Sequence, residues 1–314
     1  MVGNHRQGRM NQRTAYMEFL AIDLGQSGSR LRYLNGEVRS DGPAFDPVLG
    51  LVGSVERTLH ALAPSPVDIV ALSLTGLRGS VPDPGPLAEL CNNLTGATRV
   101  CVADDGFAAH MGALGGTNGV VVCVGSGVVG VGRVGESVSH RDGAGPILGD
   151  DGGGFWIGNR GLRAALQASE GRGPDTALLE RVQDEYGAIR ASILSRSQQE
   201  AMQWCVDVAQ LVLTVADEGD GVAIGIRTAA AQLIAATALA SWRAICTTGE
   251  ETAVSYSGRI LENVSLRDQV IDQLHKKAPF MKWHDPIGDN LHGALLLAQS
   301  PQHDAAPLMR WWNQ

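Results

Sequence analysis

One glycine-rich stretch, residues 143–158 (GAGPILGDDGGGFWIG), constrains the fold of this chain more than any other part of its sequence. Glycine packs poorly and loses much conformational entropy on folding, so this density indicates backbone that lies against something small. Asp150 and Asp151 place two carboxylates where backbone N–H groups are also free to point inward. The alternative is a tight strand-to-helix connection whose acids are simply solvated.

The composition limits the class of protein. The chain has 314 residues, of which 44% are hydrophobic and 18% charged, as in a globular protein with two domains or one large one. Its 40 glycines cluster at a few places, which indicates several tight ligand loops. The net charge of −8, without a basic run, argues against a nucleic-acid partner. A phosphate ligand stays open, because backbone amides and Mg²⁺ can supply a positive field.

The cysteines and the apolar runs indicate a cytoplasmic protein. No metal-binding spacing links the cysteines, and most lie in apolar runs, which predicts buried thiols in a reducing compartment for Cys91, Cys101, Cys123, Cys205 and Cys246. No uninterrupted apolar segment of about 18 residues is present, so we expect no membrane span. Residues 1–17 are polar and lack the apolar centre of a signal peptide, which predicts a disordered extension.

Two stretches share the pattern of an apolar strand, a glycine-rich turn and a second strand. They cover residues 19–34 and 119–134 and predict two β-hairpins, with the appearance of a weak internal duplication. A plain hairpin needs only a two-residue turn, so these longer, hydroxyl-bearing tips suit the wrapping of a phosphate, although a generic wide turn would look similar. The tips contain Asp23, Gly25, Ser27 and Gly28 in the first hairpin and Gly125, Ser126 and Gly127 in the second.

The remaining pattern is that of an α/β protein. We expect strands at 67–74, 99–103 and 253–257 and helices at 51–62, 107–114, 155–170, 198–216, 222–245, 261–275 and 289–299. The prolines at 82, 84 and 86 predict a loop, and the tail with Trp311 and Trp312 has no assigned element. Ligands in open α/β sheets bind at the carboxyl ends of strands, and three strands end in Asp23, in Thr75-Gly76 and in Asp104-Asp105.

The order of these motifs resembles the sugar kinase, Hsp70 and actin superfamily. Within it, the chain is similar to the N-acetylglucosamine kinases and the BadF/BadG/BcrA/BcrD-type ATPases over residues 19–298, through IDLGQSGSRLRYL, ALSLTGL, VADDGFAAHMGA, VVCVGSGVVG and GDDGGGFWIG. The resemblance implies two ribonuclease-H-like α/β domains, an actin-like ATPase fold, with a cleft between them. The first would cover residues 18–108 together with a helix at 289–300, and the second residues 109–288.

The resemblance also implies a cytoplasmic, ATP-dependent sugar kinase that uses Mg²⁺ and acts on N-acetylglucosamine or a relative such as glucosamine; a homodimer is compatible with it. Asp105 would be the catalytic base, although it could instead cap its helix. Asp23 would hold Mg²⁺. The nucleotide would contact Asp23, Gly25, Ser27, Gly125, Ser126, Gly127, Ser257 and Gly258. The sugar would contact Thr75, Gly76, Asp105, Gly143, Ala144, Gly145 and Asp150.

Several positions depart from the family pattern. Gln26 replaces a glycine of the first phosphate loop, and Val128 replaces a serine of the second. Ala144 replaces a tryptophan and Gly153 a serine, and a sugar-contacting asparagine has no clear counterpart. The sugar pocket would then be larger or less polar, which leaves glucosamine, a muramic acid derivative or another modified hexose open as the substrate.

Two other functions compete with a kinase. One is an activator-type ATPase, but the cysteines lack the spacing of an iron–sulfur cluster. The other is a sugar-binding regulator with a decayed kinase site. The retained Asp23, Asp105 and Asp150 disfavour it, because binding alone needs no base that faces a phosphate.

Overall fold

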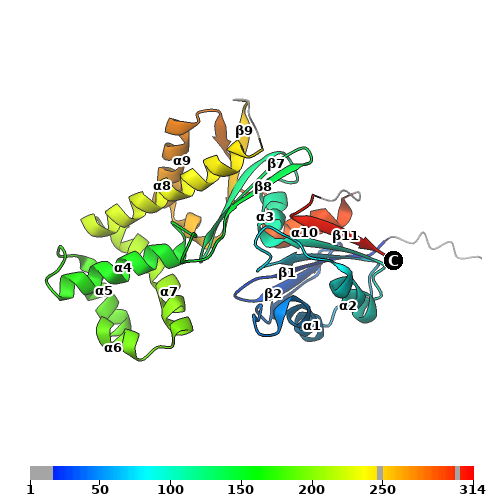
Figure 1. The fold of residues 1–314 in the computed structure, drawn as a ribbon, viewed down its shortest axis with the longest axis horizontal. Coiled ribbons are helices and arrows are strands. Elements are labelled where there is room, and N and C mark those ends of the chain that lie inside the picture. Colours follow the sequence, from blue (N-terminus) through cyan, green and yellow to red (C-terminus); the bar gives the residue numbers. More distant parts are fainter. Residues whose placement is uncertain (1–16, 246–249, 301–304) are drawn as a thin grey trace, which may run out of the picture.

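The computed structural model describes residues 17–245, 250–300 and 305–314. Its strands form two sheets in separate halves of the molecule (Figure 1). The first sheet has the order β11-β5-β4-β1-β2-β3 and the second the order β10-β9-β6-β7-β8. The strands are β1 (Phe19–Leu24), β2 (Ser29–Tyr33), β3 (Val38–Gly42), β4 (Ile69–Leu74), β5 (Arg99–Asp104), β6 (Gly119–Val124), β7 (Val128–Val134), β8 (Ser137–Asp142), β9 (Thr252–Ser257), β10 (Met281–Trp283) and β11 (Met309–Asn313).

The helices cover both sheets. Helix α10 packs on β1 and on α3, so that the end of the chain returns to the first half of the molecule. The helices are α1 (Gly50–Leu62), α2 (Gly85–Thr95), α3 (Asp105–Ala113), α4 (Gly154–Ser169), α5 (Ala177–Tyr186), α6 (Ile189–Leu194), α7 (Gln198–Asp217), α8 (Gly221–Arg243), α9 (Val264–Lys277) and α10 (Asn290–Gln299), with a 3₁₀ turn at Arg259–Glu262.

The two predicted hairpins are confirmed as β1-β2 and β6-β7, each antiparallel. Strands β1, β4 and β5 are parallel to one another, in a register that pairs Asp23 with Ser73 and Leu74 with Asp104. Parallel strands end at the same edge of their sheet, so the polar residues after β1, β4 and β5 are brought together. Strand β9 pairs in parallel with β6 in the other sheet and delivers Ser257 beside Cys123.

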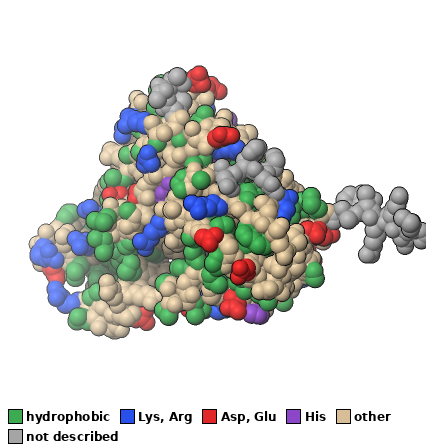
Figure 2. Space-filling view, turned by 45° about the vertical axis from the view of Figure 1, so that its right-hand side comes forward, with side chains coloured by type: hydrophobic (Ala, Val, Ile, Leu, Met, Phe, Trp, Pro, Cys, Tyr) green, Lys and Arg blue, Asp and Glu red, His purple; other side chains and the backbone are tan. Residues whose placement is uncertain are grey.

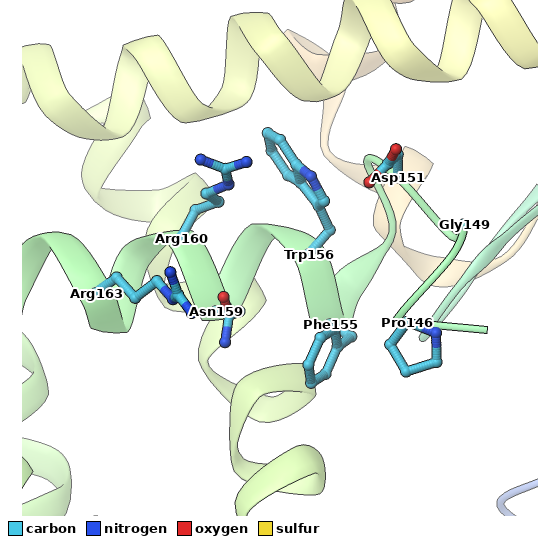
Figure 3. A pocket seen from close by; sticks show the side chains of 8 residues that line it. All are labelled: Pro146, Gly149, Asp151, Phe155, Trp156, Asn159, Arg160 and Arg163. Atoms are coloured by element: carbon cyan, nitrogen blue, oxygen red, sulfur yellow. The ribbon is translucent and has the colours of Figure 1, made fainter.

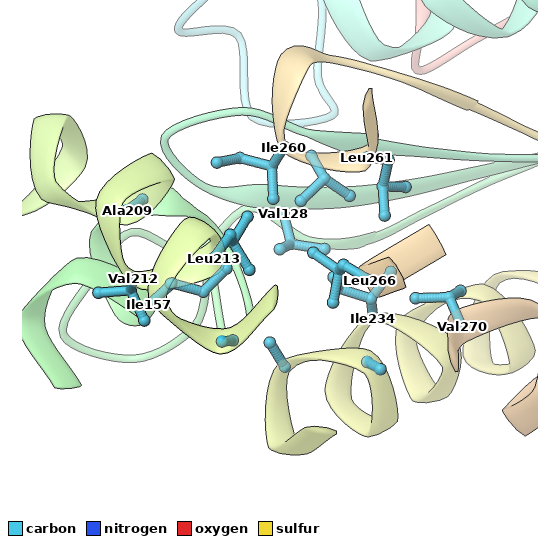
Figure 4. Packing of buried hydrophobic residues seen from close by; sticks show 14 of the residues in the cluster. Val128, Ile157, Ala209, Val212, Leu213, Ile234, Ile260, Leu261, Leu266 and Val270 are labelled. Atoms are coloured by element: carbon cyan, nitrogen blue, oxygen red, sulfur yellow. The ribbon is translucent and has the colours of Figure 1, made fainter. Parts of the chain in front are cut away.

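The second half of the molecule has the larger hydrophobic core. Figure 4 shows part of this core, in which side chains of β7, α4, α7, α8 and α9 meet. Helices α4 and α7 cross closely at Gly158, where a Cβ would lie 1.7 Å from the carbonyl oxygen of Cys205. On the face drawn in Figure 2, acidic and basic side chains are interspersed, in keeping with the modest net charge.

Helix α8 is the central helix of this half, as its nearly all-round apolar sequence predicts. It packs against β6, β7, β8 and α9. By length and composition alone it could cross a membrane, with half of its most apolar window buried inside the molecule. The sequence has no uninterrupted apolar run of about 18 residues, but this did not exclude a helix whose average hydropathy is high enough to cross a membrane. Its Arg227 is buried and forms an ion pair with Asp217 of α7.

Several expectations need correction. The loop expected around the prolines ends at Pro84, which precedes helix α2, and Pro86 occupies the first turn of that helix, where its missing N–H costs nothing. The helix expected at 261–275 is a 3₁₀ turn followed by α9. The tail forms β11, antiparallel to β5. The short elements β3, β8, β10, α5 and α6 were not predicted.

Other expectations stay predictions. Residues 1–16 and Cys246 lie outside the described residues. The Cys91, Cys101 and Cys205 thiols are buried, as predicted, whereas Cys123 is only partly buried. The predicted division at residue 108 falls within α3, so the assignment of residues 18–108, 289–300 and 109–288 to two domains remains a proposal.

Candidate functional site

Two adjacent acids at the end of β5 have different surroundings. Asp104 is the N-cap of α3: its carboxylate accepts hydrogen bonds from the backbone N–H of Gly106 and of Gly79, both at 3.0 Å. The interpretation of Asp105 as the cap is therefore wrong, because Asp105 is the first residue of the helix. Burial, followed by the charges of Asp104 and Asp23, raises the pKa of Asp105 to about 7, against a hydrogen bond from the Thr75 hydroxyl, which lowers it.

Asp23 is buried at the end of β1 and held from two sides. Its Oδ1 accepts a hydrogen bond from the Ser73 hydroxyl at 2.8 Å, and its Oδ2 pairs with the Arg30 guanidinium at 2.9 Å. Arg30 also pairs with Asp289 at 2.8 Å, which raises the pKa of the guanidinium further although burial opposes the shift. Arg30 therefore joins two carboxylates.

The tips of the two hairpins meet. The Ser126 hydroxyl donates to the side-chain carbonyl of Gln26 at 3.1 Å, across a separation of 100 residues in sequence. Ser27 is exposed beside them, and a Cβ on Gly125 would meet no atom within 4 Å. The two predicted phosphate loops therefore share one space, with hydroxyls and open backbone on both sides.

Asp150 lies against the second tip. Its Oδ1 accepts from the Val128 backbone N–H at 3.1 Å, and its carboxylate packs so closely on Gly127 that a Cβ there would lie 2.4 Å away. Asp150 has a φ of 59°, which its own backbone N–H supports by donating to Asp142 at 2.7 Å. Desolvation by burial, with the nearby charges of Asp142 and Asp151, raises the pKa of Asp150.

Two departures from the family pattern have a packing reason. Val128 is fully buried in the hydrophobic core, so its side chain does not face the open side of the tip. At Gly153 a Cβ would lie 2.7–2.9 Å from backbone atoms of Gly127, so a serine there would force the two loops apart.

The predicted sugar residues lie on both sides of this space. Thr75 is buried and contacts Asp105. Gly76 has a φ of 84°, and a Cβ added there would lie 3.4 Å from the Phe45 ring. In the loop after β8, Gly143 and Gly145 have positive φ values of 70° and 85°. Ala144, between them, is exposed.

The predicted adenosine residues connect to helix α3, which begins at Asp105. A Cβ on Gly258 would lie 2.3 Å from the Val124 carbonyl oxygen, so this glycine permits close contact with the second tip. The Ser257 hydroxyl donates to Asn290 at 3.2 Å, and the Asn290 amide donates to the Asp105 carbonyl at 3.3 Å.

Sequence reasoning missed three residues that hold this arrangement together. Asn290 joins β9 to α3, and no local pattern marks it. The His140 ring lies between Gly79 and Gly143, with its Nε2 3.9 Å from Asp104, which ties the loop after β4 to the loop after β8. Ser73 could have been found, because its hydroxyl interrupts an otherwise apolar strand next to the acid-bearing strand β1.

The charges of the site suit a magnesium ion. The charge of Asp23 contributes to the raised pKa of Asp105, so the two carboxylates feel each other. Mg²⁺ commonly uses one or two carboxylates together with water and phosphate oxygens. A divalent cation near Asp23 would relieve this repulsion, so the residues present fit the ion.

Sequence comparisons relate this chain to known proteins. A family model described as the BadF/BadG/BcrA/BcrD ATPase family matches residues 42–298. The chain is 24% identical over 229 residues to an N-acetylmuramic acid/N-acetylglucosamine kinase of Clostridium acetobutylicum, covering 69% of this chain and 73% of the relative.

Solved structures show the same fold. A Chromobacterium violaceum protein, assigned as an N-acetylglucosamine kinase, has a TM-score of 0.71 and 26% identity, with 90% of this chain and 99% of the other covered. A Porphyromonas gingivalis protein, also assigned as an N-acetylglucosamine kinase, has a TM-score of 0.70 and 15% identity, with 90% of this chain and 98% of the other covered. A ROK family glucokinase of Streptomyces griseus, solved with glucose and AMPPNP, has a TM-score of 0.56 and 18% identity, covering 90% and 99%.

The predicted two-domain, actin-like ATPase fold of sugar kinases is thereby confirmed. The family model spans well over half of the chain, and its match contains the Asp105, Gly125–Gly127 and Asp150 motifs. The chain belongs to the BadF/BadG/BcrA/BcrD ATPase family.

Proposed function

We propose that this protein is an ATP-dependent sugar kinase that transfers the γ-phosphoryl group of Mg-ATP to a hydroxyl of an amino sugar. The observation that carries the proposal is Asp105, a partly buried carboxylate at the point where β1, β4 and β5 end, with a pKa raised to about 7. A general base works best when its pKa is near the working pH. Its neighbour Asp104 supplies the helix cap, so Asp105 keeps its carboxylate for chemistry.

In the proposed reaction, Asp105 accepts the proton of the sugar hydroxyl while the hydroxyl oxygen forms a bond to the γ-phosphorus. The bond from that phosphorus to the bridging oxygen breaks, and ADP leaves with the electron pair. Phosphoryl transfer asks the protein chiefly for positioning and for neutralised charge. Thr75 orients the Asp105 carboxylate through its hydroxyl, and Asn290 holds the backbone of the same residue.

The two hairpin tips are proposed to bind the phosphates. Ser27 and Ser126 supply hydroxyls, and Gly25, Gly125 and Gly127 supply backbone that a phosphate can approach. Asp23 would hold Mg²⁺, directly or through water, and the ion would supply charge neutralisation on the phosphate oxygens. Ser257 and Gly258 would border the nucleoside, with Ser257 also fixing Asn290.

Asp150 is proposed to bind a sugar hydroxyl. One of its oxygens accepts from Val128, and its loop also carries Gly143, Ala144 and Gly145. The small side chain at Ala144 leaves room beside the sugar where relatives have tryptophan. N-acetylglucosamine, glucosamine and muramic acid derivatives are the candidates, in line with the printed name of the Clostridium relative.

The test is ADP release with Mg-ATP and a panel of N-acetylglucosamine, glucosamine, N-acetylmannosamine, N-acetylmuramic acid and glucose. Loss of a general base should lower kcat of Asp105→Asn by about a hundredfold or more, while sugar binding changes only several-fold. Asp272→Asn, an exposed acid on α9, is the matched control and should keep full activity. ATP hydrolysis that ignores every sugar would favour an activator-type ATPase, and sugar binding without turnover would favour a regulator.

A further inference from the structure

Both carboxylate oxygens of Asp23, the proposed magnesium ligand, accept hydrogen bonds from protein groups. The Ser73 hydroxyl donates to Oδ1 at 2.8 Å, and Nη2 of Arg30 donates to Oδ2 at 2.9 Å. Like charges repel, so the guanidinium and a divalent cation compete for this carboxylate, whether the ion binds it directly or through water. The phosphoryl transfer proposed above gives Arg30 no role.

The β1-β2 hairpin itself brings Arg30 to Asp23. The two residues are direct partners in the antiparallel register, which places their side chains on the same face of the sheet. The Asp23 side chain is only 12% exposed, whereas that of Arg30 is 41% exposed. The guanidinium therefore lies at the border between a buried acid and solvent, and it can leave the acid without disturbing the hydrophobic core.

Asp289 offers Arg30 a second partner. Nη1 of Arg30 donates to Oδ2 of Asp289 at 2.8 Å, and the Asp289 side chain is 52% exposed. The other oxygen, Oδ1, accepts from the His292 backbone N–H at 2.9 Å, as the N-cap of α10. Helix α10 thus fixes Asp289, and the guanidinium keeps one ion pair when it leaves Asp23. Ser73, in contrast, is fully buried in β4, so Arg30 is the donor that a metal ion displaces.

We propose that Arg30 competes with the divalent cation for Asp23 and keeps the affinity of this site for the free ion low. When the ion binds, Arg30 leaves Asp23 and stays paired with Asp289. The proposal rests on the proposed function, because it takes Asp23 as the magnesium ligand, and it adds an order of binding. Mg²⁺ takes phosphate oxygens as ligands beside one or two carboxylates. The ion therefore reaches Asp23 as a complex with the nucleotide, whose oxygens compensate for the displaced guanidinium.

Binding of Mn²⁺ without a nucleotide tests the competition, with the electron paramagnetic resonance signal of the free ion as the readout. Arg30→Gln should bind Mn²⁺ at least about tenfold more tightly than wild type, because a charge-assisted hydrogen bond no longer has to be broken. Asp289→Asn keeps an N-cap but leaves Arg30 with Asp23 alone, so it should bind the ion about two- to fivefold more weakly than wild type. Wild type should also bind Mn²⁺ more weakly than ADP in solution does.

Two substitutions control for the loss of charge alone. Figure 3 shows Arg163 on α4, at the wall of a hollow that this helix forms with the loop at residues 146–151. This arginine is exposed and belongs to the other half of the molecule, so Arg163→Gln should leave Mn²⁺ binding within about twofold of wild type. Asp285→Asn, at an exposed acid shortly before α10, is the matched control for Asp289→Asn and should likewise leave the affinity unchanged.

Equal Mn²⁺ affinity of wild type and Arg30→Gln would overturn the proposal. A gain in Arg30→Gln that survives the further substitution Asp23→Asn would overturn it too, because the ion would then bind elsewhere, and so would wild type that binds Mn²⁺ more tightly than ADP does. Sugar-dependent ADP release, measured on the same preparations, separates the proposal from the kinase function. Turnover without a gain in Arg30→Gln keeps the kinase and removes the competition. A gain that requires Asp23, without turnover of any sugar, keeps the competition and removes the kinase.

Discussion

At the scale of single residues, the site depends on how two neighbouring acids divide their tasks. Asp104 is nearly fully buried, and its two carboxylate oxygens accept hydrogen bonds from the backbone N–H groups of Gly106 and Gly79. Asp105 makes no such cap, and its carboxylate faces Thr75. The stretch VADD shows two acids before a helix but does not say which one is the cap, because Asp is favoured both at N-cap and in the first turn.

The raised pKa of Asp105 predicts a cost in stability at neutral pH. The pKa is about 7 in the folded protein and near 3.8 in the unfolded chain. Between these values the folded state holds one more proton, so the free energy of unfolding falls as the pH rises through this window. Asp105→Asn removes the titration and should raise the melting temperature at pH 8 by a few degrees relative to wild type, with little gain at pH 4.

Thermal melts of wild type, Asp105→Asn and Asp272→Asn across pH 4–8 check this prediction. The exposed Asp272 serves as the control, and its variant should follow the wild-type curve. A difference in melting temperature between Asp105→Asn and wild type that is the same at every pH would mean that the surroundings do not raise the pKa of this carboxyl.

The same pKa predicts that kcat/KM rises with pH and levels off above about 7, because the proposed base must be ionised to accept a proton.

At the scale of elements, helix α3, which begins at Asp105, is fixed by its crossing with α10. A Cβ on Gly293 would lie 1.8 Å from the Ala108 carbonyl oxygen, and one on Gly112 would lie 2.0 Å from that of Asp289. The two helices thus touch through their backbones. This contact sets the position of Asn290, whose amide reaches the Asp105 carbonyl 185 residues away in sequence.

Gly293→Ala should therefore damage both stability and catalysis. The added methyl must push the helices apart, a strain that typically costs about 1–3 kcal/mol, and it should also lower kcat by loosening Asn290. Gly225→Ala on α8, where a Cβ would meet nothing within 4 Å, is the matched control and should stabilise by about 0.5–1 kcal/mol. Denaturant melts measure the change in stability, and steady-state kinetics measure the change in kcat. Equal effects of the two substitutions would show that the α3–α10 crossing does not position Asn290.

Elements that follow from a local sequence pattern were predicted, whereas elements that depend on distant contacts were not. The hairpins β1-β2 and β6-β7 were found because apolar strands and glycine tips are local patterns. Helix α2 was missed because prolines read as a loop, although Pro86 sits in its first turn. Strand β11 was missed because it forms only by pairing with the edge of β5, a long-range contact that no local pattern around its two tryptophans indicates.

The same distinction holds for the site residues: those marked by a local sequence pattern could be predicted, and those that act through long-range contacts could not. Acids at strand ends are visible in a sequence, as Asp23 near the end of β1 and Asp105 directly after β5 illustrate. Asn290 and His140 could not be predicted, because each acts through a partner far along the chain. The Ser257 hydroxyl, expected beside adenosine, also donates to Asn290, a bond that only the packing of α10 creates.

At the scale of the whole molecule, the two sheets are joined at their hairpin tips by one hydrogen bond. Gln26, which stands where relatives have glycine, accepts from Ser126 in the space proposed for the phosphates. A nucleotide bound in this proposed space would have to break this contact. The contact is exposed, and a hydrogen bond of this kind contributes roughly 0.5–1.5 kcal/mol net.

Gln26→Gly should accordingly tighten the binding of Mg-ADP by about two- to tenfold, the factor that corresponds to the lost hydrogen bond. Titration calorimetry of wild type and variant measures it directly. Gln26→Ala is the control, because it removes the same contact without the backbone freedom of glycine, and it should give most of the gain. Weaker binding in both variants would assign the opposite role to Gln26: its amide would then be a phosphate ligand, and its contact with Ser126 would align the two tips for the nucleotide.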